Sequence, residues 1–253
     1  MILITGDTHG EFSRFNTKRF PLQKKLNKND YVIICGDFGG IWNDSKAGRN
    51  WLSWLDNKTY TTLFIDGNHE NFVLLKQYPV EEWNGGKVQF ILESVIRLMR
   101  GQVYNIDGKL FFTMGGASSH DISGGILEPN DPDLKHKVKQ LNNLGVLYRI
   151  NRVSWWKEEL PCAEEYDEAE KNLDLHNWEV DYIISHCAPI SIADTITDAS
   201  YPSDGLTGFF EILKDRCTYD RWFFGHYHKN RVLSQKHVCI YDKIIEIGNM
   251  GES

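Results

Sequence analysis

A single pattern, repeated five times in 253 residues, limits most strongly how this chain can fold. In each repeat, a short and mainly apolar run is followed by a turn and by a side chain that can bind a metal ion. Runs of this length are typical of buried strands, and open α/β sheets place their sites beyond the carboxyl ends of such strands. We therefore expect five buried strands whose following residues meet in one site. The runs are 2–5, 31–35, 63–66, 182–185 and 222–225.

The polar residues that follow these runs offer nitrogen and oxygen donors and no thiolate. In an extended segment, side chains two residues apart point the same way, so each D-x-H or H-x-H pair can reach one ion. Seven such donors exceed what one tetrahedral ion uses, and they suit two divalent ions that share a carboxylate. The donors are the carboxylates Asp7 and Asp37, the amide Asn68, and the imidazoles His9, His186, His226 and His228.

Helical spacing of apolar residues separates several of these strands. It predicts helices over 45–57, 71–77, 131–144 and 207–216. It also predicts an acidic helix after Pro161, in which Tyr166, Ala169 and Leu173 face the core. Gly145 is a suitable end for the third helix, since glycine readily adopts the left-handed conformation of many helix ends. Further strands are expected at 88–92, 95–99, 110–114, 237–241 and 244–247. These elements predict an α/β (α+β) fold with two packed β-sheets flanked by helices.

The segment 118–178 contains none of the recurring motifs. Because the motifs before and after it must meet in one site, we interpret it as a cap-like insertion into a single domain that spans 1–253. The adjacent residues Trp155 and Trp156 lie in this segment. They can anchor the insertion to the core, or line a substrate pocket and stack on a base, and we favour the anchoring role.

The charge of the chain argues against a nucleic-acid-binding protein, because 28 Lys and Arg against 35 Asp and Glu give a net charge of −7. Such a surface repels a polyanion on average, so a phosphate-bearing ligand needs a locally positive site. No apolar stretch approaches the roughly 18 residues that span a bilayer, so we expect no membrane segment. The five cysteines form no CxxC pair and the chain opens without a basic leader. We therefore expect a cytoplasmic protein.

The motifs occur in the order D-x-H, G-D, G-N-H-E, H and G-H-x-H, from Asp7 to His228. This ordered set resembles the calcineurin-like metallophosphoesterase superfamily. The resemblance implies a metallo-dependent phosphatase-like four-layer sandwich, in which two central sheets lie between helices. It also implies a metal-dependent phosphoesterase, a hydrolase acting on phosphoric ester bonds.

The resemblance further implies a role for each donor. The first metal would be held by Asp7, His9, Asp37 and His228. The second would be held by Asp37 again, as the bridge, with Asn68, His186 and His226. A hydroxide bridging the two ions would attack phosphorus, and His69, which is not a metal ligand, would protonate or stabilise the leaving group. Manganese is expected as the metal, with iron and zinc as alternatives that the same donors accept. The histidines outside the motifs are expected to be structural or exposed: His120, His136, His176 and His237.

Two departures from the family pattern bear on the substrate. The motifs lie nearest to the serine/threonine protein phosphatase branch, but Gly39 and Gly40 follow the second motif here. Asp66 stands where that branch usually carries an arginine, just before the third motif. The arginines with which that branch grips phosphate are therefore missing from these motifs. We expect Asp66 itself to point into the fold and to pair there.

With charge supplied by the metal ions alone, we expect about one net positive charge at the site, which balances a phosphodiester monoanion better than a monoester dianion. Phosphoserine peptides should then be poor substrates, and the segment 118–178 should determine which ester fits. The leading hypothesis is a phosphoesterase that acts on a small phosphate ester. Alternatives are a catalytically silent scaffold of the same fold, a serine/threonine protein phosphatase and a nuclease, the last disfavoured by the acidic composition.

Overall fold

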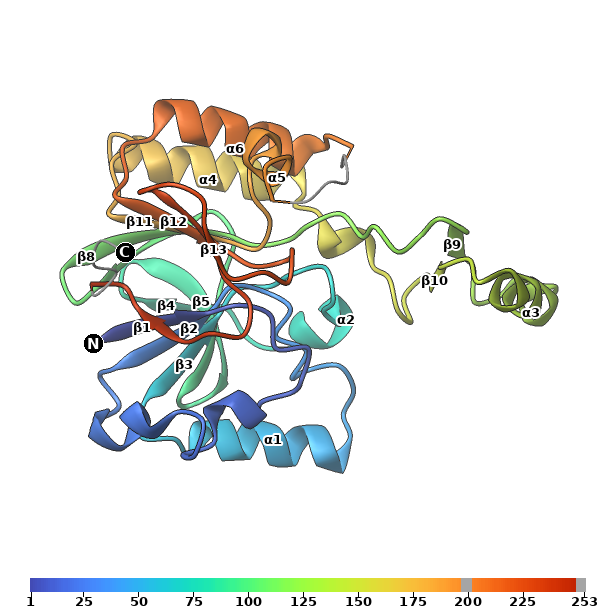
Figure 1. The fold of residues 1–253 in the computed structure, drawn as a ribbon, viewed down its shortest axis with the longest axis horizontal. Helices are drawn as coiled ribbons and strands as arrows, with labels where there is room; N and C mark the ends of the chain where they lie inside the picture. Colours follow the sequence, from blue (N-terminus) through green and yellow to red (C-terminus); the bar gives the residue numbers. More distant parts are fainter. Residues whose placement is uncertain (197–201, 249–253) are drawn as a thin grey trace.

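The computed structural model describes residues 1–196 and 202–248 and arranges them in four layers, with two β-sheets between two layers of helices (Figure 1). Helix α1 (Lys46–Asp56) lies on the outer face of the first sheet, and α4 (Ala163–Leu175), α5 (Ile190–Ala193) and α6 (Gly205–Arg216) cover the outer face of the second. This arrangement confirms the fold class predicted from the sequence. Within the described residues, no helix combines the length and the apolar character that crossing a membrane requires.

The first sheet has seven strands, and its central strands β1, β2, β3 and β6 run parallel. Their carboxyl ends therefore share one edge of the sheet. The strand order is β15 (Ile245–Glu246), β1 (Ile2–Thr5), β2 (Tyr31–Ile34), β3 (Thr61–Phe64), β6 (Val95–Leu98), β5 (Gly86–Leu92) and β4 (Glu81–Trp83).

The second sheet has six strands, and its four inner strands are also parallel, so that the ends of β11 and β12 lie at one edge. The order is β13 (Arg231–Val232), β14 (His237–Cys239), β12 (Arg221–Phe224), β11 (Tyr182–Ser185), β8 (Lys109–Met114) and β7 (Gln102–Ile106). The five apolar runs of the repeated pattern thus all form strands, three in the first sheet and two in the second.

The apolar runs are continuous because each central strand is buried on both faces. In β1, Ile4 joins the core between the two sheets, whereas Leu3 joins the core between the first sheet and α1. In β12, Phe223 faces the first sheet, and Trp222 packs in the core formed with α4 and α6. The side chains of neighbouring residues therefore fill different cores, which is what a four-layer arrangement requires.

The predicted helices are present with small shifts of their ends. Ser45 caps α1 by accepting a hydrogen bond from the Gly48 amide, and Asp204 caps α6 through the Thr207 amide. Gly145 ends helix α3 (Leu134–Leu144) with φ of 63°, as predicted. The helix expected at 71–77 is reduced to α2 (Phe72–Leu75). Short 3₁₀ helices occur at Ser13–Phe15, Pro21–Lys25 and Lys157–Glu159.

The segment 118–178 is not one insertion. Helix α4 belongs to the core, because Ala169 and Leu173 are fully buried against the second sheet. Only residues 118–155, which we call the arm, extend away from the layers (Figure 1). The arm contains a parallel pair of short strands, β9 (Ile126–Leu127) and β10 (Arg149–Ile150), and helix α3 (Leu134–Leu144), none of whose residues is buried.

Trp156 returns the chain from the arm to the body. Its side chain is 2% exposed and packs edge-on against Trp42, with 5.4 Å between ring centroids. The anchoring role is therefore confirmed for Trp156. Its neighbour Trp155 instead lines a cavity of about 810 Å³ together with Arg97 and Arg152.

Asp66, at the end of β3, points into the fold as expected. Its carboxylate is fully buried and accepts hydrogen bonds from Arg97 (Nη2, 2.8 Å) and Arg100 (Nε, 2.7 Å), both of which are also buried. Burial alone raises the pKa of this carboxyl, but Arg100 and Arg97 favour its charged form, so the pKa lies below its usual value. The aspartate thus ties β3 to β6 and to the segment that follows β6.

We expect Asp66→Asn to lower the free energy of unfolding by about 3–5 kcal/mol, because it leaves two buried guanidinium groups without their shared carboxylate. Urea unfolding of the metal-free protein measures this loss. Asp44→Asn is the matched control, since the Asp44–Arg49 ion pair is exposed and should leave the urea midpoint nearly unchanged. Equal midpoints for the two variants would contradict a stabilising role for Asp66.

Candidate metal centre

The seven predicted donors lie together at the carboxyl ends of the parallel strands of both sheets. Three loops come from the first sheet, after β1, β2 and β3, and two from the second, after β11 and β12. Sheet packing therefore brings together residues that are up to 221 positions apart, from Asp7 to His228. The position agrees with the site predicted from strand ends.

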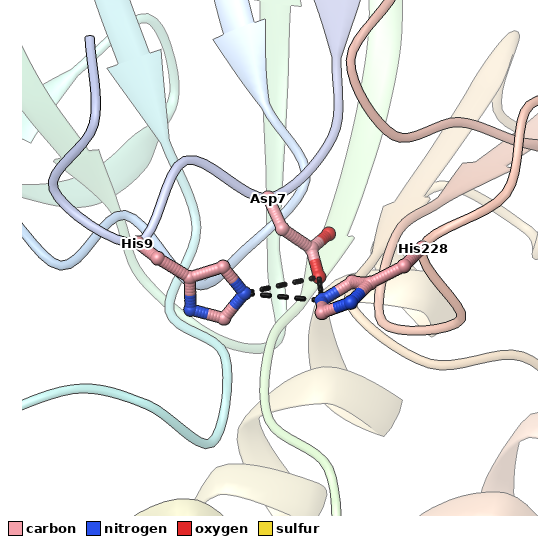
Figure 2. Close-up of side chains that lie close together, drawn as sticks. All are labelled: Asp7, His9 and His228. Atoms are coloured by element: carbon pink, nitrogen blue, oxygen red, sulfur yellow. Dashed lines mark hydrogen bonds and ion pairs between the residues drawn. The ribbon is translucent and has the colours of Figure 1, made fainter.

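The first group of donors consists of Asp7, His9 and His228 (Figure 2). The Nε2 atom of His228 lies 3.1 Å from Asp7 Oδ2 and 3.0 Å from the Nε2 atom of His9. His9 Nε2 lies 3.9 Å from the same Asp7 oxygen. Two imidazole nitrogens and a carboxylate oxygen thus converge on one point, as ligands of a single ion do.

The second group consists of Asp7, Asp37 and His186. His186 Nε2 lies 3.4 Å from Asp37 Oδ1 and 3.2 Å from the amide oxygen of Asn68. The other ring nitrogen, Nδ1, lies 2.8 Å from the carbonyl oxygen of Cys35. A proton on Nδ1 satisfies that carbonyl and leaves Nε2 free to bind a metal, which is the usual arrangement of a metal-binding histidine.

Asp37 lies between the two groups. One of its carboxylate oxygens faces His186, and the other, Oδ2, lies 3.7 Å from His9 Nε2. The carboxylate is therefore placed to bind on both sides, which supports the predicted bridging role. Asp7, which belongs to both groups, also accepts a hydrogen bond from the His226 backbone amide at 3.0 Å. The His226 ring packs against that of His186, with centroids 5.0 Å apart.

Glycines in three motifs make this convergence possible. At each of them, an added Cβ atom would overlap a donor side chain that comes from another loop. A residue with a side chain therefore cannot occupy these positions without displacing a donor. The pairs are Gly36 with His186, Gly67 with Asp37, and Gly225 with Asp7.

Several donors hold a left-handed backbone conformation that residues other than glycine rarely adopt. The φ angles are 47° at His9, 48° at Asp37, 67° at His226 and 50° at His228. Each such residue costs on the order of 1 kcal/mol, and such strain is concentrated at functional sites in proteins. Four of the seven predicted donors thus share a conformation that aims them at one point at the expense of local stability.

The electrostatics suit divalent cations. Burial raises the pKa of the Asp37 carboxyl, but His186 and the neighbouring histidines outweigh it and hold that pKa well below its usual range. Burial lowers the pKa of His186, but Asp37 outweighs it and raises that pKa above its ordinary value. Two buried carboxylates at one point favour positive charge, and a proton on His186, whose pKa is raised, would supply it when no metal is bound. Metal binding should release such a proton.

The amide of Asn68 is oriented by two residues that the sequence analysis missed. Its Nδ2 donates to Ser119 Oγ at 3.2 Å, and Ser119 Oγ donates to the buried carboxylate of Glu159 at 2.6 Å. This chain turns the Asn68 oxygen toward His186. Ser119 lies at the base of the arm and Glu159 follows its end, so the arm supports the site although neither residue belongs to a motif.

His69 lies at the edge of the donor cluster rather than within it. Its backbone amide donates to Asp37 Oδ1 at 2.8 Å, and its ring centroid is 5.3 Å from that of His9. Burial lowers the pKa of His69; Asp37 opposes this shift, and the nearby Arg149 adds to it. The next residue, Glu70, is fully buried and accepts the amide of Phe38 at 2.7 Å, which joins the loops after β2 and β3.

The arm contributes three further residues to the site that the sequence analysis did not assign. His120 is exposed, as expected, and its ring lies 5.2 Å from that of His226. Arg149 Nη2 lies 3.2 Å from Nδ1 of His69, and Asp121 is its ion-pair partner. A guanidinium group, paired with the Asp121 carboxylate, thus lies near the predicted donors, which the motifs alone did not indicate. No local motif marks these residues, because they reach the site only through the path of the arm.

Comparisons with known proteins agree with this geometry. A family model described as calcineurin-like phosphoesterase matches residues 1–230. Lariat debranching enzyme A of Xenopus laevis is 26% identical over 115 residues, which cover 40% of this chain and 22% of that protein. Lariat debranching enzyme of Danio rerio is 24% identical over 163 residues, 57% of this chain and 28% of that protein. The matched region thus spans about a quarter of the length of these relatives.

Proposed function

This chain belongs to the calcineurin-like phosphoesterase family, and we propose that it is a metal-dependent phosphoesterase that uses two divalent metal ions to hydrolyse a small phosphate ester. The observation that carries the proposal is the convergence of seven nitrogen and oxygen donors from five loops, with no thiolate among them. Such a donor set suits manganese, iron or zinc, and we propose manganese in a cytoplasmic protein.

We assign the donors to two ions that share one carboxylate. Asp7, His9, Asp37 and His228 would hold the first ion. Asp37, Asn68, His186 and His226 would hold the second. When bound, such ions supply a nucleophilic hydroxide at neutral pH and stabilise negative charge at phosphorus. The proximity of His9 to one oxygen of Asp37, and of His186 to the other, supports Asp37 as the shared ligand.

The protein's own residues then orient the donors and handle the leaving group. The Cys35 carbonyl fixes the His186 ring, and Ser119 turns the Asn68 amide. His69 stands beside the donors without joining them, which supports its proposed role in protonating or stabilising the departing oxygen. We also propose that residues 1–253 form a single domain with a cap. The cap consists of the arm 118–155 and not of the whole segment 118–178.

A catalytically silent scaffold of the same fold is the alternative from another functional class. The complete donor set counts against it, because a scaffold has no need of all seven donors, and left-handed backbone at four of them is typical of functional sites. Nuclease and protein phosphatase activity remain within the same chemistry. The debranching relatives are a reason to include a phosphodiester among the test substrates.

We expect the protein purified without added metal to contain manganese, and chelation to abolish hydrolysis of p-nitrophenyl phosphate and bis-p-nitrophenyl phosphate. Adding manganese should restore it. Elemental analysis and the absorbance of released nitrophenolate measure both steps. One zinc per chain and no other metal would overturn the manganese assignment. Absence of turnover of either ester by protein with bound metal would favour the scaffold.

A further inference from the structure

The arm delivers a cation to the edge of the donor cluster. Arg149, in β10, places Nη2 3.2 Å from Nδ1 and 3.3 Å from Nε2 of His69. The same side chain is 16% exposed, so part of it is accessible from solvent. Since His69 flanks the donors, the guanidinium group borders the space that a phosphate group must occupy to reach them.

The arm itself fixes the orientation of this guanidinium group. Nε donates to Asp121 Oδ1 at 2.9 Å and Nη2 donates to the other oxygen of Asp121, while Nη1 donates to the Ser154 carbonyl at 3.3 Å. A guanidinium group has five N–H donors. Three are thus held by the arm, and the second N–H of Nη2 is within hydrogen-bond distance of the His69 ring, a contact that a phosphate oxygen would have to share or replace. The group is preorganised, which lowers the cost of ordering it around a ligand.

Other arginines near the strand ends are committed elsewhere. Arg14 donates to the backbone carbonyl oxygens of Asp7 and Tyr241, each at 2.6 Å. Arg97 and Arg100 are buried and bind Asp66. These guanidinium groups support the loops from behind, whereas Arg149 faces the site.

We propose that Arg149 binds a terminal oxygen of the substrate phosphate and favours phosphomonoesters, with Asp121 as the residue that positions it. This inference rests on the proposed phosphoesterase function. A monoester dianion presents three terminal oxygens and two negative charges, whereas a diester presents two oxygens and one charge. The monoester therefore has one more charged acceptor to offer, and hydrogen bonds to charged groups are the strong ones. This revises the preference for diesters that the motifs alone predict.

The first test measures binding of inorganic phosphate to the manganese-loaded protein by calorimetry. We expect Arg149→Met to weaken phosphate binding roughly tenfold or more, and Arg149→Lys to retain part of it because the charge remains. Arg152→Met is the matched control: it removes a cation from the exposed part of the same arm and should change binding less than twofold. Equal phosphate affinity of the Arg149→Met and Arg152→Met variants would overturn the inference.

The second test compares two esters. Arg149→Met should lower kcat/KM for p-nitrophenyl phosphate at least tenfold, mainly through KM, and lower that for bis-p-nitrophenyl phosphate less than threefold. Metal content, measured for every variant, should not change. Equal losses on both esters would show a merely structural role.

These outcomes separate the inference from the proposed function. If the unmodified protein hydrolyses neither ester but its phosphate binding depends on Arg149, the proposed function fails and the binding role stands. If it hydrolyses both esters and Arg149→Met changes nothing, the inference fails and the proposed function stands.

Discussion

Replacing Asp37 by alanine is expected to empty the metal centre and abolish turnover. Asp37 faces both His9 and His186 through its two oxygens, so its loss removes a ligand from each proposed ion. Mutation of a residue that only hydrogen-bonds to a metal ligand usually lowers metal affinity by about 10–100-fold. Loss of a ligand that two ions share should lower the affinity by more than that. Because the carboxylate also accepts the His69 amide, the loop after β3 should lose one of its ties to the loop after β2, while the Glu70–Phe38 hydrogen bond remains.

Elemental analysis of the protein after gel filtration tests the loss of metal. An assay of ester hydrolysis on the same preparation tests the loss of turnover. Asp133→Ala is the control, since Asp133 is an exposed carboxylate on the arm that caps α3 with its backbone and not with its side chain. We expect that variant to keep its metal and its activity. An Asp37→Ala protein that retains two ions would show that Asp37 does not bridge them.

His69→Asn is expected to keep both ions and to lower kcat by roughly a hundredfold or more, the range for loss of a group that transfers a proton in the transition state. The ring of His69 lies outside the two groups of converging donors, so metal content should not depend on it. The loss should be greatest for esters with poor leaving groups, because these need protonation most.

A series of aryl phosphates with leaving groups of rising pKa tests this dependence, with elemental analysis of each preparation. His136→Asn is the control, because His136 is an exposed histidine on α3. A His69→Asn protein that lacks metal would place His69 among the ligands. A loss of equal size for every leaving group would remove it from proton transfer.

The fold could be predicted largely because its strands are buried on both faces. Runs such as that of β2 need an apolar residue at every position, since Val32 and Ile33 fill different cores, and this leaves an obvious signal. The edge strand β7 was missed because Gln102 and Asn105 interrupt its apolar residues. The three-residue strand β4 was missed because Glu81 and Glu82 give it no apolar signal.

The residues of the site likewise include some that could be predicted from the sequence and some that could not. Its donors could be predicted because each follows a strand end at a fixed spacing. Ser119, Asp121 and Arg149 could not, because their positions depend on how the arm leaves the body at Ser118 and returns at Trp156. Nothing in the local sequence fixes that path. The inward spacing of Ala169 was visible in the sequence, but the absence of a donor motif led us to assign α4 to the insertion.

The three motif glycines carry a consequence for protein engineering. Each makes room for a donor of a different loop, so that Gly67 protects Asp37 and Gly225 protects Asp7. A single loop grafted from a relative can therefore preserve the metal centre only if the donors of the neighbouring loops fit against the glycines of the grafted loop. The unit that can be transplanted is the full set of strand ends. Conversely, one added methyl group at such a glycine offers a way to silence the centre while every donor stays in the sequence.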